Sequence, residues 1–354
     1  MAPVRRSDTK GGRVDRAGDF KYYEDIYIAH WDTANRGWKK AESIKGKLTT
    51  DGHDASLSIS PDGKKIFIYR NNGRTIIGDI FVSKIRNSGA WGNPKSLGKP
   101  INTSYFESSA SLSADGNKLY FVSEKEGKKN GAQGGGDIYV VEKITKSTWG
   151  EPKNLGPVIN TPGDEISVFI HPDGKTLFFS SDGHLSIGGL DIFMSKMQKD
   201  GTWSKPENLG YPINSKEDEK GIVVSRKGDY AYMASRRKGG FGGLDIYSFE
   251  LPEKAKASPV SYVRGYVYDK ETDKPIGSTI ELSDINTGEK LISFESDPKT
   301  GTFFIILESN KDYSFTIDKV GYLFHSENFS LTQTTEIKPY ELKIGLGKPK
   351  NGES

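Results

Sequence analysis

Short apolar runs, each preceded by a glycine-containing turn, recur between residues 20 and 250. The runs cover residues 65–69, 118–122, 176–180 and 230–234, and the turns before them end at Gly63, Gly116, Gly174 and Gly228. A turn of this kind beside a short apolar run is typical of a β-hairpin. Apolar residues spaced three and four apart, which would indicate amphipathic helices, are almost absent. The pattern therefore predicts an all-β fold.

One tripeptide, Asp-Ile-Tyr or Asp-Ile-Phe, recurs five times in the same region. Its copies begin at Asp25, Asp79, Asp137, Asp191 and Asp245, which sets a repeat of 54 to 58 residues. Three copies also carry, in one phase, a tryptophan that we expect to lie packed in the fourth strand of the unit, namely Trp91, Trp149 and Trp203. A unit of this length with four short strands is typical of a β-propeller blade, which buries its faces only against its neighbours.

The repeat therefore predicts a five-bladed β-propeller over residues 20–251. The first copy enters at its third strand and the last copy ends without a tryptophan-bearing fourth strand, so we expect the ring to be incomplete at both ends. Residues upstream of the chain would normally supply the first two strands of the first blade. We therefore expect residues 1–19 to be irregular.

A different β pattern follows the repeat. Residues 252–260 have the Pro, Lys and Ala content of a linker. About seven short alternating segments then occupy residues 261–346 and predict a small β-sandwich. Residues 347–354 form a tail.

Composition removes several classes of function. The net charge is +3 and the basic residues are scattered rather than gathered in a stripe, so we expect no nucleic acid partner. No segment approaches the roughly 20 apolar residues that span a bilayer. With no cysteine, disulfides and thiolate metal sites are excluded, and the five histidines show no metal-ligand spacing. We therefore expect no metal and no cofactor.

Two known folds share motifs with the chain. Residues 60–64 (Ser-Pro-Asp-Gly-Lys) and 241–247 resemble the TolB-type, WD-like propeller repeat. Residues 265–269, 297–303 and 321–322 resemble the carboxypeptidase regulatory-like domain, a transthyretin-like sandwich, which would cover residues 261–346. The tail from Tyr340 resembles the segment that precedes an OmpA-like peptidoglycan-binding domain.

The order of these domains is similar to that of the PorE-type, OmpA-family component of the Bacteroidetes type IX secretion system. The resemblance covers the middle part of such a protein. It implies a periplasmic, outer-membrane-associated protein whose partners are envelope proteins of a secretion complex. Peptidoglycan would be bound only through a domain that is absent from this chain.

Each predicted blade begins its innermost strand with an acidic residue in one phase, namely Asp54, Glu107, Glu165 and Glu219. We expect these residues at one mouth of the central channel, where an acidic ring would bind a cation or a basic peptide. The alternative is structural, because a carboxylate repeated in every blade usually accepts hydrogen bonds from loop amides or pairs with a neighbouring lysine. The repetition favours the structural alternative.

The sequence contains no recognisable catalytic motif. A Gly-x-Ser-x-Gly nucleophile motif is missing. Some five-bladed propellers are glycosidases, but their chemistry needs carboxylates in different environments, whereas the four acidic residues here are symmetric. We therefore expect no catalytic residues and interpret the chain as a non-catalytic scaffold for protein partners. A glycan-active propeller enzyme and a ligand- or ion-binding sensor propeller are the alternatives.

The loops between the second and third strands vary most within the repeat. The longest of them, residues 124–136, contains Glu124, Lys125, Lys128 and Lys129. Loops that differ while their scaffold repeats are the usual place of recognition, so we expect these four residues to contact a partner. A merely solvated loop is an equally good interpretation.

Overall fold

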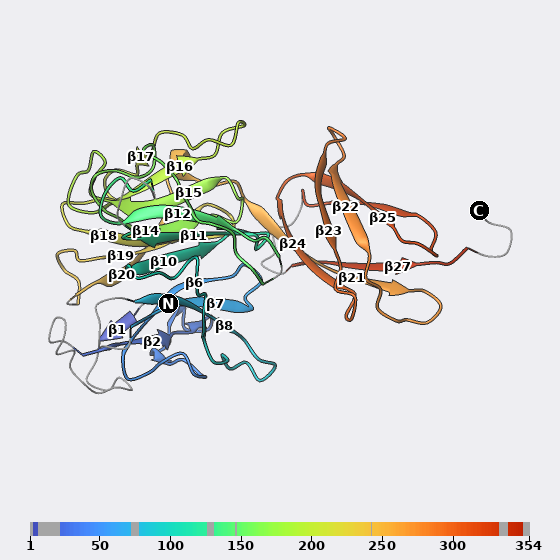
Figure 1. Ribbon diagram of the computed structural model, residues 1–354, viewed down its shortest axis with the longest axis horizontal. Helices are drawn as coiled ribbons and strands as arrows, with labels where there is room; N and C mark the ends of the chain where they lie inside the picture. Colours follow the sequence, from blue (N-terminus) through green and yellow to red (C-terminus); the bar gives the residue numbers. More distant parts are fainter. Residues whose placement is uncertain are drawn as a thin grey trace. The chain divides into compact units, whose positions relative to one another are not determined.

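The computed structural model describes residues 3–5, 22–71, 78–125, 131–145, 147–241, 243–332 and 339–349. The chain divides into two compact units: unit 1 comprises Met1–Ser225 and Asp229–Lys256, and unit 2 comprises Arg226–Gly228 and Ala257–Ser354. The division at Lys256 lies within the expected linker 252–260, which contains the 3-10 helix η2 (Glu253–Ala255). All other described elements are strands, so the all-β prediction is confirmed (Figure 1).

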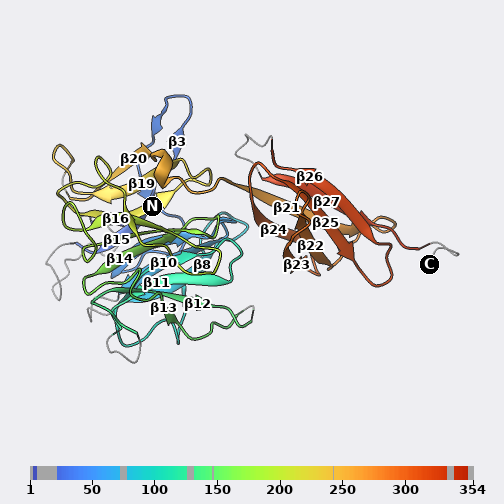
Figure 2. The same ribbon diagram turned by 90° about the horizontal axis from the view of Figure 1, so that it is seen from above.

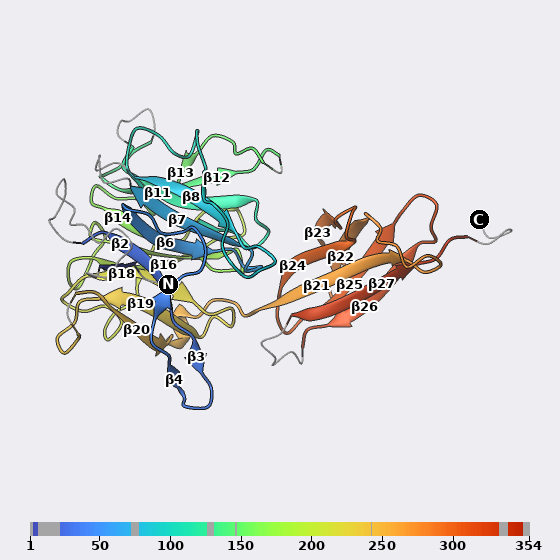
Figure 3. The same ribbon diagram turned by 90° about the horizontal axis from the view of Figure 1, so that it is seen from below.

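The described part of unit 1 contains five antiparallel sheets, numbered here in chain order. The first sheet is β1 (Pro3–Arg5), β2 (Glu24–Ile28) and β5 (Glu42–Ser43); the second is β6 (His53–Ile59), β7 (Lys65–Asn71), β8 (Asp79–Lys84) and β9 (Lys95–Ser96); the third is β10 (Glu107–Leu112), β11 (Lys118–Ser123), β12 (Asp137–Glu142) and β13 (Lys153–Asn154). The fourth is β14 (Glu165–Ile170), β15 (Thr176–Ser181), β16 (Asp191–Lys196) and β17 (Glu207–Asn208); the fifth is β18 (Glu219–Val224), β19 (Tyr230–Ser235) and β20 (Asp245–Glu250). A separate hairpin of β3 (Trp31–Asp32) and β4 (Gly37–Trp38) projects away from the sheets (Figures 2 and 3).

The turn between the first two strands of a sheet is fixed by its own side chains. In the second sheet the Ser60 hydroxyl donates to Asp62 Oδ1 at 2.5 Å and accepts the backbone N–H of Lys65 at 2.9 Å. Gly63 has a φ of 71°, a left-handed conformation that glycine adopts without strain. The same hydroxyl and carboxylate contacts recur in the third sheet at Ser113 and Asp115. These turns close the predicted hairpins and set their register.

Consecutive sheets pack against each other through apolar faces. One cluster joins Tyr120, Val122 and Ile138 of the third sheet to apolar residues of β14, β15 and β16 in the fourth. The opposite face of the third sheet, with Phe121 and Tyr139, packs in another cluster against the second sheet. The third sheet is therefore buried on both faces. This explains why the residues in the middle of β11 and β12 are apolar.

The structure differs from the expectation that the N-terminal residues 1–19 are irregular. Residues 3–5 are not irregular, because β1 pairs with β2 and places Val4 opposite Asp25. Backbone pairing along an open strand edge needs no side-chain pattern, so the sequence alone did not reveal it. Residues 1–2 and 6–19 lie outside the described residues.

The tryptophans lie just before the fourth strands rather than within them. Trp91, Trp149 and Trp203 each form an isolated bridge with the residue that follows the third strand. Trp91 is 7% exposed, and the other two are half-buried. The bridge forms at this point because the chain has only just reversed direction after the third strand, and β9, β13 and β17 pair further along.

Unit 2 is built from two sheets around one core. One sheet has the order β24 (Thr302–Glu308), β21 (Val260–Asp269), β27 (Tyr340–Leu346), and the other has the order β23 (Lys290–Glu295), β22 (Thr279–Asp284), β25 (Asp312–Asp318), β26 (His325–Ser330). Val263, Val267, Leu282, Phe315 and Ile344 belong to one apolar cluster of this unit. Strand β27 pairs parallel with β21, whereas all other pairs in the unit are antiparallel.

The Gly321-Tyr322 pair, which we expected to be one of the short strands of unit 2, lies in a turn. Gly321 has a φ of 86°, a left-handed conformation that interrupts extended structure, and the Tyr322 backbone N–H donates to the carbonyl of Lys319. The Tyr322 hydroxyl donates to Asp269 Oδ2 at 2.8 Å. The Gly-Tyr pair therefore ties a turn to the end of β21.

Candidate functional site

The acidic residue that begins β14, the first strand of the fourth sheet, is held by its own loop. Glu165 Oε2 accepts the backbone N–H of Thr161 at 2.9 Å, and Oε1 accepts the hydroxyls of Thr161 and Ser181 at 2.8 and 2.7 Å. Thr161 belongs to the connection that enters β14, and Ser181 ends β15. The carboxylate thus joins the two ends of one hairpin to the incoming chain.

The other three acidic residues are held in the same way. Glu107 accepts hydrogen bonds from Thr103 and Ser123; Asp54 from Thr50 and Arg70; Glu219 from Ser215, Ser235 and Arg237. All four acidic residues are 0% exposed. The carboxylates expected to form an acidic ring therefore face their own loops and strands rather than solvent.

Burial disfavours the charged form of these groups. It raises the pKa of Asp54 and of Glu107, and it raises the pKa of Glu165 to about 7 in spite of the hydrogen bonds from Ser181 and Thr161. Asp54 has Arg70 Nε at 2.6 Å and Glu219 has Arg237 Nη2 at 3.2 Å, whereas no described cation pairs with Glu165. With its pKa raised to about 7, Glu165 changes its charge near neutral pH.

The aspartates of the tripeptide organise the loops at the same end of each sheet. Asp191 Oδ2 accepts the backbone N–H of Ile187 at 2.6 Å and the side-chain amide of Asn208 at 2.7 Å. Asp137 makes the equivalent contacts with Gln133 and Asn154. Each aspartate thus holds the loop before the third strand against the fourth strand.

These loops also contact the connection that enters the next sheet. The Leu190 backbone N–H donates to Asp218 Oδ1 at 3.2 Å, and a Cβ at Gly188 would lie 2.3 Å from the carbonyl oxygen of Ser215. Arg237, in the loop after β19, donates through Nη1 to the carbonyl of Pro212 at 2.8 Å. The loop 182–190 and the described residues 236–241 therefore both adjoin the connection between β17 and β18.

Large apolar side chains are exposed on these three segments. Leu185 and Ile187 in the first loop are 94% and 52% exposed, Tyr211 in the connection is 84% exposed, and Phe241 in the second loop is fully exposed. We call these four residues the apolar loop surface. Sequence reasoning missed them, because their exposure depends on the paths of loops that share no pattern.

The expected interaction loop is described only in part. Glu124 is exposed and Lys125 is half-buried, and both follow β11 at the same end of the sheet. Burial raises the pKa of Glu124, with a smaller contribution from the Asp164 carboxylate. Lys128 and Lys129 lie outside the described residues, so the structure brings only two of the four predicted residues together.

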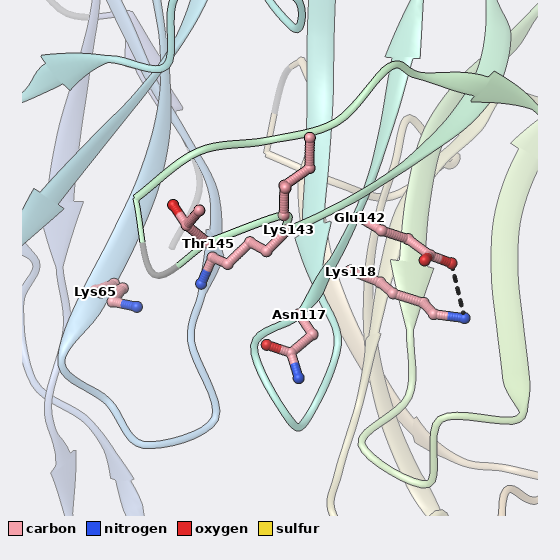
Figure 4. Close-up of a pocket in the computed structure, with 7 residues that line it drawn as sticks. Lys65, Asn117, Lys118, Glu142, Lys143 and Thr145 are labelled. Carbon is pink, nitrogen blue, oxygen red and sulfur yellow. Dashed lines mark ion pairs between the residues drawn. The ribbon is translucent and has the colours of Figure 1, made fainter.

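A hollow lies at the opposite end of the second and third sheets. It has a volume of about 610 Å³ and is lined by Lys65, Asn117, Lys118, Glu142, Lys143, Ile144 and Thr145 (Figure 4). Two of its three ammonium groups already have partners: Lys118 pairs with Glu142 at 3.3 Å, and Lys143 Nζ donates to the carbonyl of Gly116 at 2.6 Å. Burial, and secondly the nearby charge of Lys65, lowers the pKa of Lys143. The hollow is basic, but its lysines are largely occupied by the protein itself.

The described ranges contain no group of three or more His, Cys, Asp or Glu side chains arranged to hold a metal ion. None of the described residues forms a helix with the length and apolarity needed to cross a membrane.

The sequence matches no protein-family model and no curated protein. Among solved structures, the chain is similar to a prolyl endopeptidase at 14% identity and a TM-score of 0.36, covering 81% of this chain and 34% of that protein. It is similar to a glycosyl hydrolase from Bacteroides ovatus at 12% identity and a TM-score of 0.40, covering 71% and 82%, and to an α-L-arabinofuranosidase from Lactobacillus brevis at 12% and 0.37, covering 63% and 81%. The chain thus spans about a third of the length of the prolyl endopeptidase.

These comparisons correct one interpretation. The missing motifs led us to expect a protein that is not an enzyme, whereas the three similar structures are all of hydrolases. The expectation that this protein is not an enzyme, which rested on the missing motifs, is therefore wrong. Identities of 12 to 14% and TM-scores below 0.5 identify neither a family nor a substrate for this chain.

Proposed function

We propose that unit 1 is a β-propeller whose loop end binds a partner protein. The innermost strands β6, β10, β14 and β18 contact one another in sequence order, which supports five sheets arranged as consecutive blades. Unit 2, with a three-stranded and a four-stranded sheet around one core, is the regulatory-like sandwich in this proposal.

The apolar loop surface is the observation that carries the proposal. Large apolar side chains exposed on neighbouring loops of a folded protein often mark an interaction site. Aromatic anchors such as Tyr211 and Phe241 are enriched in the buried centres of protein interfaces. Both side chains are held on loops whose backbones are fixed by Asp245 and Arg237, so little ordering is needed on binding.

The partner that we propose is an envelope protein, and the compartment is the periplasm. Support comes from the resemblance of the sequence to an OmpA-family component of the type IX secretion system and from the absence of cysteine. In that arrangement the protein links the secretion machinery to peptidoglycan through a domain outside this chain. Fractionation of cells that produce the protein tests the compartment directly: recovery in the cytoplasmic fraction alone contradicts it.

Site-specific crosslinking tests the surface. A photoreactive amino acid at Phe241 should crosslink to a defined envelope protein, and the doubly substituted variant Leu185→Ser, Tyr211→Ser should lose that adduct. The matched control is a photoreactive amino acid at Val320 of unit 2, which is 96% exposed and outside the surface. Equal adducts from both positions, or adducts unaffected by the double substitution, would refute the proposed surface.

Glycan hydrolysis is a second candidate, favoured by Glu165 alone. A carboxyl with a pKa of about 7 is suited to act as a general acid near neutral pH. Glu165 is 0% exposed, so a substrate would reach it only if Thr161 and Ser181 moved aside. Turnover of a glycoside panel that disappears in Glu165→Gln, with folding retained, would support this candidate, and absence of turnover across the panel would remove it.

A further inference from the structure

The isoleucine of the repeated tripeptide has two different environments. Ile26, Ile80, Ile138 and Ile192 are each 0% exposed, whereas Ile246 in β20 is 59% exposed. Two neighbours on the same sheet are exposed with it: Val223 of β18 at 52% and Tyr232 of β19 at 37%. Val223 lies directly opposite Tyr232, so these side chains share one face of the fifth sheet.

In the other sheets the following sheet packs on the side chain of this isoleucine, as for Ile80 and Ile138, and a separate segment binds its backbone. In the fourth sheet the Leu209 backbone N–H donates to the carbonyl of Ile192 at 3.1 Å. The side-chain amide of Asn214 then binds both backbone groups of the same residue: Oδ1 accepts the Ile192 N–H at 2.8 Å and Nδ2 donates to its carbonyl at 2.9 Å. Ile213, between them, is 5% exposed.

The second and third sheets repeat these contacts. Leu97 and Asn102 bind Ile80 in this way, and Leu155 and Asn160 bind Ile138, with all distances between 2.8 and 3.1 Å. The covering segment has one pattern in all three sheets, Leu-Gly-x-x-Ile-Asn, at residues 97–102, 155–160 and 209–214. The first sheet uses a related segment, in which Ile44 donates to the carbonyl of Ile26 and Thr49 stands in the asparagine place.

The fifth sheet ends at β20. Its order is β18-β19-β20, and no described segment pairs with the outer edge of β20. Ile246 lies opposite Ala234 as Ile192 lies opposite Ser180, so the N–H and carbonyl of Ile246 point to that open edge. The edge therefore offers the same two backbone groups that Asn214 binds in the fourth sheet.

We propose that the open edge of β20 binds an extended segment of a partner protein with the pattern Leu-Gly-x-x-Ile-Asn. The leucine N–H would donate to the carbonyl of Ile246, the asparagine amide would bind its N–H and carbonyl, and the isoleucine would cover the apolar face beside Tyr232. Strand addition of this kind draws affinity from backbone hydrogen bonds and specificity from the alternate side chains.

A second copy of the chain does not supply the segment. Its three complete Leu-Gly-x-x-Ile-Asn segments are already used, since Asn102, Asn160 and Asn214 are 6%, 1% and 0% exposed. The related run 346–351 has lysine in the isoleucine place, and its Leu346 is buried in β27. The occupant is therefore a segment of another protein.

A synthetic peptide tests the proposal without knowledge of the partner. The fluorescently labelled peptide 151–162, Glu-Pro-Lys-Asn-Leu-Gly-Pro-Val-Ile-Asn-Thr-Pro, carries the third-sheet covering segment. Anisotropy titration with the full chain should show saturable binding. The peptide with Asn160→Ala should bind at least about tenfold more weakly, because the backbone N–H of Ile246 is left without an acceptor.

Variants of the protein locate the site. Ile246→Lys should weaken binding by about tenfold or more, because the lysine cannot pack under the peptide isoleucine. The control Ile144→Lys replaces a side chain that is 72% exposed in the turn after β12 and should leave binding unchanged. Phe241→Ser should also leave it unchanged, which separates this edge from the apolar loop surface.

Three results would overturn the proposal. They are no saturable binding of the peptide, equal binding of the Asn160→Ala peptide, and binding by Ile246→Lys that equals that of the unmodified chain. The peptide substitution cannot disturb the folding of the protein, so it decides the matter even if Ile246→Lys fails to fold. A self-association of the chain that Ile246→Lys abolishes would assign the edge to a second copy instead.

Discussion

The fourth and fifth sheets of unit 1 contain almost the same third strand, yet they bury it differently. Asp191-Ile192-Phe193 and Asp245-Ile246-Tyr247 both pair in register with the strand before them. Ile192 is 0% exposed and Ile246 is 59% exposed. The local sequence therefore determines that the strand forms, and the segment and the sheet that follow it determine whether the strand is covered.

The comparison predicts its largest effect for truncation of the isoleucine. Ile192→Ala should lower the free energy of unfolding by about 2–5 kcal/mol, since it leaves a cavity in a packed interface. Ile246→Ala should cost less than about 0.5 kcal/mol, as for other exposed sites. Urea unfolding followed by tryptophan fluorescence measures unit 1 alone, because all five tryptophans lie within it. Equal losses for the two variants would mean that Ile246 is covered in solution.

A second difference concerns charge at the innermost strands. Glu219 of the fifth sheet has Arg237 at 3.2 Å, whereas Glu165 of the fourth sheet has only hydroxyl and amide partners. The folded-state pKa of Glu165 is raised to about 7, so the folded protein holds this proton more tightly than the unfolded chain. Stability should therefore fall as pH rises from about 4.5 to about 7, by up to about 3 kcal/mol from this group.

Glu165→Gln should remove that pH dependence. Glutamine keeps an acceptor for the Thr161 N–H, and its amide can donate to the hydroxyls of Thr161 and Ser181, which can turn to accept. Urea unfolding at several pH values should show a flatter profile for this variant than for the unmodified protein. The exposed Glu151→Gln is the control and should keep the original profile. A profile that Glu165→Gln leaves unaltered would show that Glu165 is charged throughout this range.

The smallest expected effect concerns Asn214, which binds the backbone of Ile192 in the fourth sheet. No described asparagine binds Ile246 of the fifth sheet in this way. Asn214→Ala should cost about 1–3 kcal/mol, because the buried N–H of Ile192 loses its acceptor. Asn328→Ala in the exposed part of β26 should change stability by less than about 0.5 kcal/mol. The same fluorescence assay measures the first variant, and circular dichroism of the β signal measures the second. A loss below about 0.5 kcal/mol for Asn214→Ala would show that water replaces the amide.

The repeat allowed much of unit 1 to be predicted from the sequence. The five tripeptides mark β2, β8, β12, β16 and β20, because alternating apolar residues in a strand leave a period-2 signal. The hairpin turns could also be predicted from the sequence, because only a few residue types adopt the left-handed conformation of Gly63. These features depend on local geometry, and local geometry is what a sequence pattern records.

Side-chain partners were harder to predict. Glu165 stands at the start of a strand, as predicted, but its burial depends on Thr161 and Ser181, four residues before and sixteen after it. Threonine or serine stands four residues before each of the four acidic residues, and this repeated pair is a signal that the sequence does contain. The exposure of Leu185 and Tyr211 left no such signal, because it follows from two loops meeting at one connection.

The side-chain amide of Asn214 has one more consequence, which concerns how such a chain can grow by duplication. The asparagine that binds the third strand of one repeat lies in the connection to the next repeat. Each added repeat therefore brings the asparagine that binds the repeat before it. Duplication or loss of a unit therefore leaves every internal joint intact. An array of such repeats, whatever its length, keeps one terminal repeat whose third strand has an open edge. A segment encoded by another gene can bind that edge.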